Sequence, residues 1–170
     1  MSADKSTIEK FTHFYRSVLE KSLSEAKKLK QKSGPALHAM IDKSGDTLAE
    51  LEHISEQEAR NLTDYLKRDL RDAAEYMVNE GKEFSDWLAF DLQLVEDKLL
   101  ELFMEAADHT TVDLLQLKDR AEVAGYSTGD VAGPGSFSCD ACSHVIQLHG
   151  IEAIPECPQC HKTHFHRAPG

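Results

Sequence analysis

The stretch that decides the fold is residues 137–167, which read FSCDACSHVIQLHGIEAIPECPQCHKTHFHR. It holds all four cysteines of the 170-residue chain, as Cys139-Asp-Ala-Cys142 and Cys157-Pro-Gln-Cys160. In a C-x2-C turn, two thiolates converge on one ion while backbone N–H groups point at the sulfurs. Two such turns supply the tetrahedral four-sulfur set that a structural Zn²⁺ prefers. We therefore predict one Zn²⁺ per chain, with Cys139, Cys142, Cys157 and Cys160 as its ligands.

The residues around the cysteine pairs have the composition of short β-strands. Val145, Ile146, Leu148 and Ile151 favour a β-hairpin that turns at Gly150, and residues 163–167 can add a third strand. Large apolar side chains are too few here for the segment to fold alone. Metal binding can supply the missing stability, about 10–16 kcal/mol in small zinc peptides. Residues 136–170 are therefore predicted to form a zinc ribbon.

Other readings of these residues stay open. C-x2-C is also a redox motif, although that motif normally opens a helix in a βαβ setting. Spacing alone does not choose between zinc and iron in a four-thiolate site. Histidines crowd the segment, so one of them can replace a cysteine, or two of them can hold a second ion; solvated surface histidines are the simpler interpretation. The five are His144, His149, His161, His164 and His166.

The composition of the chain changes sharply near residue 125. Residues 1–124 contain three of the nine glycines and one of the five prolines, and they are rich in Leu, Ala, Glu and Lys. We therefore predict a mainly α protein in three parts. An elongated, coiled-coil-like helical domain spans residues 1–124, a flexible Gly/Pro linker spans 125–135, and the β zinc ribbon follows.

Apolar residues with helical spacing place the helices of the first domain. The first predicted helix stops at Gly34-Pro35, and a short one over 35–43 is interrupted at Ser44-Gly45. Further helices are predicted to start at Asp46, at the capping box of Ser55 and Glu58, at Ser85 and at Thr110. Apolar stripes of this length need partner helices, so the expected packing is a bundle or a long hairpin.

No motif of a known catalytic site is present. The sequence lacks H-E-x-x-H, a P-loop, G-x-G-x-x-G and G-x-S-x-G. Glu50-Leu-Glu-His53 is the only Glu-x-x-His unit, whereas a di-metal bundle needs two. A closed four-thiolate site leaves no open position for substrate, so we expect a protein that is not an enzyme.

Charge and hydropathy limit the partners. The formal net charge is -11, and the predicted ribbon offers only Lys162 and Arg167 against three acidic residues, so nucleic acid is disfavoured. A basic cluster at Lys27, Lys28, Lys30 and Lys32 is explained by the end of a helix. No apolar run is long enough for a membrane span or a secretory signal, so we expect a cytoplasmic protein that does not bind membranes.

Several stretches taken together resemble a known group of bacterial proteins. They are Tyr126–Gly135, Phe137-x-Cys139-x2-Cys142, Ile154-Pro-x-Cys157-Pro-x-Cys160, Thr163-x-Phe165-x-Arg167, and in the helices Asp64–Leu70 and Trp87–Leu92. The chain resembles the zinc-ribbon-containing proteins of the YbeL-like family over nearly its whole length. The resemblance implies a cytoplasmic protein with helices before a C-terminal ribbon, the four cysteines as metal ligands, and no established activity. A glycine usually follows the second cysteine of such a turn, where this chain has Ser143.

Three functional hypotheses follow. The first is a non-enzymatic adaptor that binds a protein partner, or a second copy of itself, through apolar helix faces and uses the ribbon as a rigid recognition tip. The second is a ribbon that works within a nucleic-acid assembly. The third is a thiol redox sensor that releases its zinc on oxidation.

Overall fold

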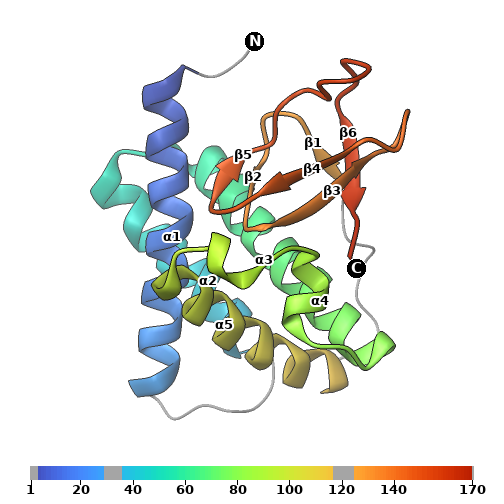
Figure 1. Cartoon of the computed structure of the whole chain (residues 1–170). Helices are drawn as coiled ribbons and strands as arrows, with labels where there is room; N and C mark the ends of the chain where they lie inside the picture. The colour runs from blue at the N-terminus through green and yellow to red at the C-terminus, as the bar shows by residue number, and fades with distance from the viewer. Residues whose placement is uncertain (1–3, 29–35, 117–124, 170) are drawn as a thin grey trace.

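The computed structural model describes residues 4–28, 36–116 and 125–169. Helices fill the first two ranges, which we call the helical body, and short strands fill residues 125–169, the β region (Figure 1). The predicted mainly α chain with a small C-terminal β-sheet region is therefore confirmed. No helix among the described residues is both long and apolar enough to cross a bilayer.

Five α-helices and one 3-10 turn make up the helical body. They are α1 (Lys5–Lys28), α2 (Ala36–Glu52), α3 (Glu56–Glu80), α4 (Phe84–Leu88), the 3-10 turn η1 (Leu92–Leu94) and α5 (Asp97–Gln116). The capping box predicted at the start of α3 is present, because Glu58 N–H donates to Ser55 Oγ and Ser55 N–H donates to the Glu58 carboxylate. Gly81 ends α3 in the left-handed conformation that glycine tolerates.

The predicted break at Ser44-Gly45 is wrong, because α2 runs through it without interruption. Gly45 serves helix packing instead. A Cβ atom at this position would lie 2.5 Å from Cγ2 of Thr63 on α3. The missing side chain thus lets α2 and α3 approach each other closely.

The helix predicted from Ser85 onward is divided in the structure. α4 ends at Ala89, whose φ of 61° is left-handed, and α5 begins only at Asp97. Ser136 from the β region donates to the Leu88 carbonyl at 2.8 Å and so satisfies a group that the helix end exposes. Thr110 opens no new helix, because it lies inside α5 and its hydroxyl donates to the Ala106 carbonyl. The predicted helix ends at Gly34-Pro35 and before Gly125 lie outside the described residues.

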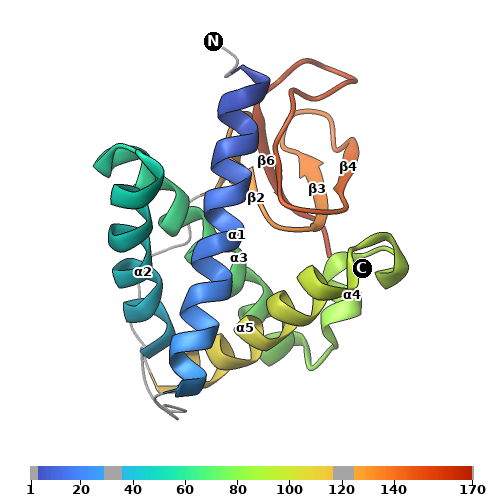
Figure 2. The same cartoon turned by 90° about the vertical axis from the view of Figure 1, so that its left-hand side faces the viewer.

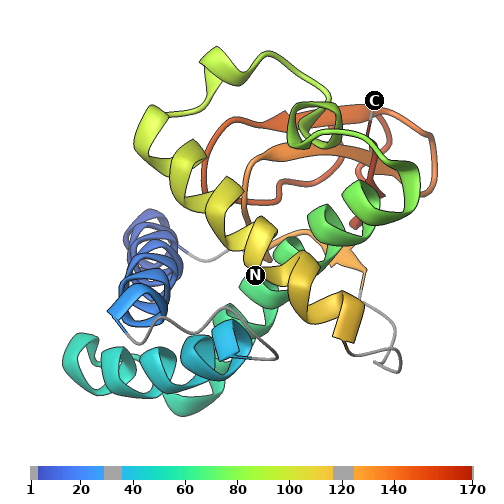
Figure 3. The same ribbon diagram turned by 90° about the horizontal axis from the view of Figure 1, so that it is seen from below.

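Apolar faces of α1, α2, α3 and α5 meet in one core, centred on Phe14, Leu19, Leu66, Leu70 and Phe103. α1 lies beside α2, and α5 packs across α3 (Figure 3). The β region sits on one side of this body, next to α1 and above α4 and α5, in both side views (Figures 1 and 2).

Six short strands form two sheets in the β region. β1 (Tyr126–Ser127), β6 (His164–Arg167), β3 (Gly135–Cys139) and β4 (Val145–Leu148) make a four-stranded sheet in that order. β2 (Val131–Ala132) and β5 (Glu152–Ala153) pair separately. The predicted third strand is present as β6. The predicted hairpin partner differs, because β4 pairs with β3 across the first cysteine turn and not with the residues after Gly150.

The segment predicted as a flexible linker has a different structure. Residues 126–127 and 131–132 are strands, and every residue from 131 to 139 is buried. A Cβ atom on Gly133 would lie 2.5 Å from the Phe103 ring, so the chain passes tightly against the helical body here. The glycines allow close packing where we expected hinge freedom.

Candidate metal centre

Two turns of the same geometry present the four cysteines. In the first, Ser143 N–H donates to the Cys139 carbonyl at 2.9 Å, and Cys139 N–H donates to the His144 carbonyl at 2.9 Å. The second repeats the pattern: His161 N–H donates to the Cys157 carbonyl at 2.9 Å, and Cys157 N–H donates to the Lys162 carbonyl at 3.0 Å. We call these turns the first and second knuckles (residues 139–144 and 157–162). The two knuckles therefore share one hydrogen-bond pattern, which orients the two thiols of each pair in the same way.

Each knuckle holds one non-glycine residue in the left-handed backbone region. φ is 62° at Ser143 and 60° at His161, each directly after the second cysteine of its pair. Ser143 occupies the position where turns of this type usually have glycine. The structure places a serine there in the conformation that glycine would adopt, so the turn keeps its shape at the expense of some strain.

The four sulfur atoms converge. Every Sγ lies within 4.8 Å of the other three. Across the knuckles, Cys139 Sγ is 3.5 Å from Cys160 Sγ, and Cys142 Sγ is 3.6 Å from Cys157 Sγ. A tetrahedron with metal–sulfur bonds of 2.3 Å has edges of about 3.8 Å. The arrangement therefore fits one tetrahedrally coordinated ion, and all four residues are free cysteines.

The pKa values of the thiols are shifted in opposite directions. A backbone hydrogen bond at His144 lowers the pKa of Cys142, but burial and the neighbouring thiols raise it to a net value of about 12, and the pKa of Cys160 is raised as well. Burial raises the pKa of the Cys157 thiol, but backbone N–H groups of Cys160 and Gln159, together with the thiols of Cys142 and Cys160, lower it to a net value of about 6. Cys139 and Cys157 are buried, Cys160 is half-buried and Cys142 is exposed. The cluster thus has one edge that faces solvent.

No histidine side chain of the β region joins the four sulfurs, although His144 and His161 belong to the knuckles through their backbones. All five are exposed. His166 pairs with Asp140 at 2.6 Å, and His164 Nδ1 is 3.2 Å from Ser127 Oγ. The cysteines are the only group of three or more Cys, His, Asp or Glu residues, among those the structure describes, whose ligand atoms come close enough to hold an ion. A second ion held by two histidines would therefore have no third protein ligand close by among the described residues.

Arg167 joins the sheet that carries the cysteines to the helical body. Its side chain is 2% exposed, donates to Tyr126 Oη at 3.1 Å and to the Pro134 carbonyl at 2.8 Å, and pairs with Asp69 at 3.1 Å. Its guanidinium carbon also lies 4.2 Å from the Trp87 ring centroid and 4.3 Å from that of Phe137. Such stacking suits a delocalised cation that has lost its water.

Asp69 of α3 receives this arginine in a fully buried position. Tyr15 Oη donates to it at 2.5 Å, Gly133 N–H at 2.9 Å and Arg68 Nε at 3.3 Å. Burial raises the pKa of Tyr15 well above its ordinary value, and the Asp69 charge adds to this, so the hydroxyl stays a donor. We call Arg68, Asp69, Trp87, Tyr126 and Arg167 the junction.

The sequence analysis did not predict the junction, although the position of Asp69 in the sequence indicates it. Asp69 follows Leu66 by three residues and precedes Ala73 by four, so it lies on the apolar stripe of α3. A carboxylate on a buried helix face requires a cationic partner. The sequence favours a core position for Trp87, Phe90 and Phe103; Trp87 and Phe103 are fully buried, and Phe90 is half-buried against the core.

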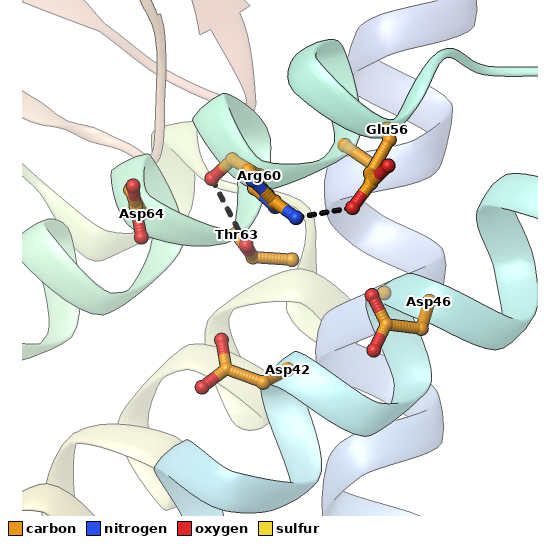
Figure 4. A pocket seen from close by; sticks show the side chains of 8 residues that line it. Asp42, Asp46, Glu56, Arg60, Thr63 and Asp64 are labelled. Carbon is orange, nitrogen blue, oxygen red and sulfur yellow. Dashed lines mark hydrogen bonds and ion pairs between the residues drawn. The ribbon is translucent and has the colours of Figure 1, made fainter.

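One hollow of about 350 Å³ lies between α2 and α3 (Figure 4). Its wall includes Asp42 and Asp46 of α2 and Glu56 and Asp64 of α3. Lys67 pairs with Asp42 and Asp64, and Arg60 pairs with Glu56, so basic side chains already offset much of the negative charge. The hollow offers no converging ligand set.

Comparison with known proteins agrees with this geometry. The model of the family described as "Zinc-ribbon containing domain" matches residues 21–169. The chain belongs to this family. The match covers most of the helical body as well as the β region, so the family is defined by both parts together.

Curated relatives in the family carry no assigned function. "Uncharacterized protein YbeL" of Escherichia coli strain K12 is 23% identical over 163 residues, which cover 95% of this chain and 98% of that protein. The protein of the same name from Escherichia coli O157:H7 matches to the same extent. No solved structure matches the chain. The predicted resemblance to the YbeL-like family is thus confirmed.

Proposed function

We propose that the chain binds one structural Zn²⁺ through Cys139, Cys142, Cys157 and Cys160. The convergence of four sulfurs within 4.8 Å supports this proposal. Four thiolates complete the coordination of a structural zinc and leave no position for water or substrate. When bound, the ion would cross-link the two knuckles and would take no part in catalysis.

We further propose that the protein works as a non-enzymatic adaptor in the cytoplasm. The closed donor set supports a structural metal. Isolated apolar side chains on the surface offer contact points for a protein partner or a second copy; they are Leu51, Val78, Leu94 and Met104 on the helical body and Val145 on β4. The net charge of -11 argues against nucleic acid and anionic membranes as partners.

Elemental analysis combined with native mass spectrometry tests the metal proposal. We expect one zinc per chain in the purified protein, retained at neutral pH. Iron in the site, or a metal-free chain with an ordered β region, would contradict it. A pull-down with the zinc-loaded protein tests the adaptor role, and a robust turnover with no protein captured would overturn it.

Exposure of Cys142 favours the thiol redox sensor as a second candidate. In this reaction a peroxide would oxidise two thiols to one disulfide and be reduced to two waters, with release of the metal. Mild peroxide treatment with a colorimetric zinc assay separates the two functions. The adaptor should retain its zinc, whereas a sensor should release it and recover it after reduction by a thiol.

A further inference from the structure

We propose that metal occupancy of the cysteine cluster controls whether the four-stranded sheet stays docked on the helical body, with Arg167 as the residue that couples the two. The proposal rests on the zinc binding proposed above. It concerns regulation: the metal state of the knuckles would be communicated to the helices.

The path from the cluster to the junction is short. In the β3–β6 ladder, Cys139 lies opposite Phe165, and Phe137 lies opposite Arg167, two residues further along both strands. Asp140 N–H donates to the His164 carbonyl at 3.0 Å, which attaches the first knuckle to the start of β6. A change in the position of Cys139 is therefore carried to Arg167 by one paired strand.

The core of the sheet is small and includes two of the four cysteines. Cys139 and Cys157 belong to the same small buried cluster as Tyr126, Phe137 and Phe165. Phe137 and Tyr126 also flank the Arg167 guanidinium, at 4.3 and 5.1 Å from their ring centroids. Loss of the metal removes the cross-link between the two knuckles from a core of few large side chains, so the residues that order Arg167 are held less firmly.

The helical body can tolerate the departure of Arg167. Most of its core comes from the helices themselves, with Val131 as a member from the β region, and Asp69 retains Arg68 and Tyr15 as partners. The exposed group would be Trp87, the only tryptophan of the chain, whose indole stacks under Arg167 and donates to Asp72 at 3.1 Å. Its fluorescence is therefore an intrinsic reporter of docking.

The first measurement uses the full-length, zinc-loaded protein and a strong chelator. Trp87 emission, far-UV circular dichroism and zinc release are followed together. We expect a red shift of the emission as zinc leaves, a retained helical signal, and reversal when Zn²⁺ is added back. An emission that stays unchanged after complete zinc removal would overturn the proposal. A purified chain that never binds zinc would contradict the proposed function instead, so the two failures are distinguishable.

The second measurement uses thermodynamic reciprocity. If zinc strengthens docking, then docking must strengthen zinc binding by the same factor. Arg167→Gln leaves all four thiols in place, and we expect it to weaken zinc affinity about tenfold, within the usual 5- to 150-fold range of such couplings. Tyr126→Phe removes one hydrogen bond to Arg167 and should give a smaller loss in the same direction.

Lys162→Gln is the matched control. It removes a positive charge from the exposed last residue of the second knuckle and keeps the backbone carbonyl that accepts from Cys157, so a through-space charge effect would be larger here than at Arg167. If docking is the cause, Arg167→Gln should lose more zinc affinity than Lys162→Gln. Equal zinc affinities for the wild type and Arg167→Gln, or a larger loss for Lys162→Gln, would overturn the proposal even if chelation also disrupts the helices.

Discussion

Ser143 and His161 occupy equivalent positions in the two knuckles. Each adopts a left-handed backbone so that its N–H reaches the carbonyl of the first cysteine of its pair. Residues with a Cβ atom pay for that conformation with about 1–2 kcal/mol, whereas glycine adopts it freely. Hydrogen bonds thus keep the shape of the turn where the sequence lacks glycine.

Replacement of Ser143 by glycine should stabilise the zinc-loaded protein. Relief of the left-handed strain exceeds the extra chain entropy of glycine, so we expect the free energy of unfolding to rise by about 0.5–1 kcal/mol. Denaturant unfolding of the zinc-loaded protein measures this. His144→Gly, at the neighbouring position where φ is not positive, is the control and should stabilise nothing.

Asp69→Asn tests the buried charge at the centre of the junction. It leaves Arg68 and Arg167 without their shared anion in a site closed to water, and we expect a loss of about 3–5 kcal/mol in the free energy of unfolding. Asp42→Asn removes an exposed partner of Lys67 and should cost under about 1 kcal/mol. Similar losses for both variants would show that the junction does not act as a buried ion pair.

At the scale of the element, glycines determine how closely segments approach. α2 packs closely on α3 because the absent side chain of Gly45 leaves space for Thr63, and the chain at Gly133 lies against α5 because the glycine leaves space for Phe103. In both places the sequence suggested a break or a hinge. Glycine can serve a protein through its conformational freedom or through its small size. The sequence does not show which of the two applies at a given glycine.

Gly133→Ala should therefore destabilise the protein by about 1–3 kcal/mol, the usual effect of overpacking. Its Cβ would lie 2.5 and 2.8 Å from two ring atoms of Phe103, which is itself fully buried and cannot move aside easily. Gly150→Ala is a matched control, since nothing lies within 4 Å of a Cβ there, and it should change stability by less than about 0.5 kcal/mol. Thermal melts followed by circular dichroism compare the two.

At the scale of the whole molecule, the helical body and the β region share buried residues. Val131 of β2 belongs to the helical core, and Ile151 packs against it. Together with the junction, these contacts make the stability of the helices depend on a region that contributes no helix.

Removal of zinc should accordingly lower the midpoint of helical unfolding, although every cysteine lies outside the helices. A loss of 2–3 kcal/mol corresponds to about 5–10 °C in a protein of this size. Circular dichroism of the helices in zinc-loaded and chelated protein measures the shift, and the same comparison in Asp69→Asn should give a smaller one. An unchanged midpoint in the wild type would mean that the two parts unfold independently.

The sequence alone determined what depends on local pattern. The two C-x2-C pairs, the capping box at Ser55 and the apolar stripes of α1, α3 and α5 are read from residue types at fixed spacing, because ligand geometry and helical periodicity act over a few residues. Only the tertiary structure decided which strand pairs with β4, why α4 stops at Ala89, and that Arg167 meets Asp69 across 98 positions of chain. Those features arise from burial and charge pairing between distant segments. Residues that meet in this way have no fixed spacing in the sequence, so no local pattern predicts the contact.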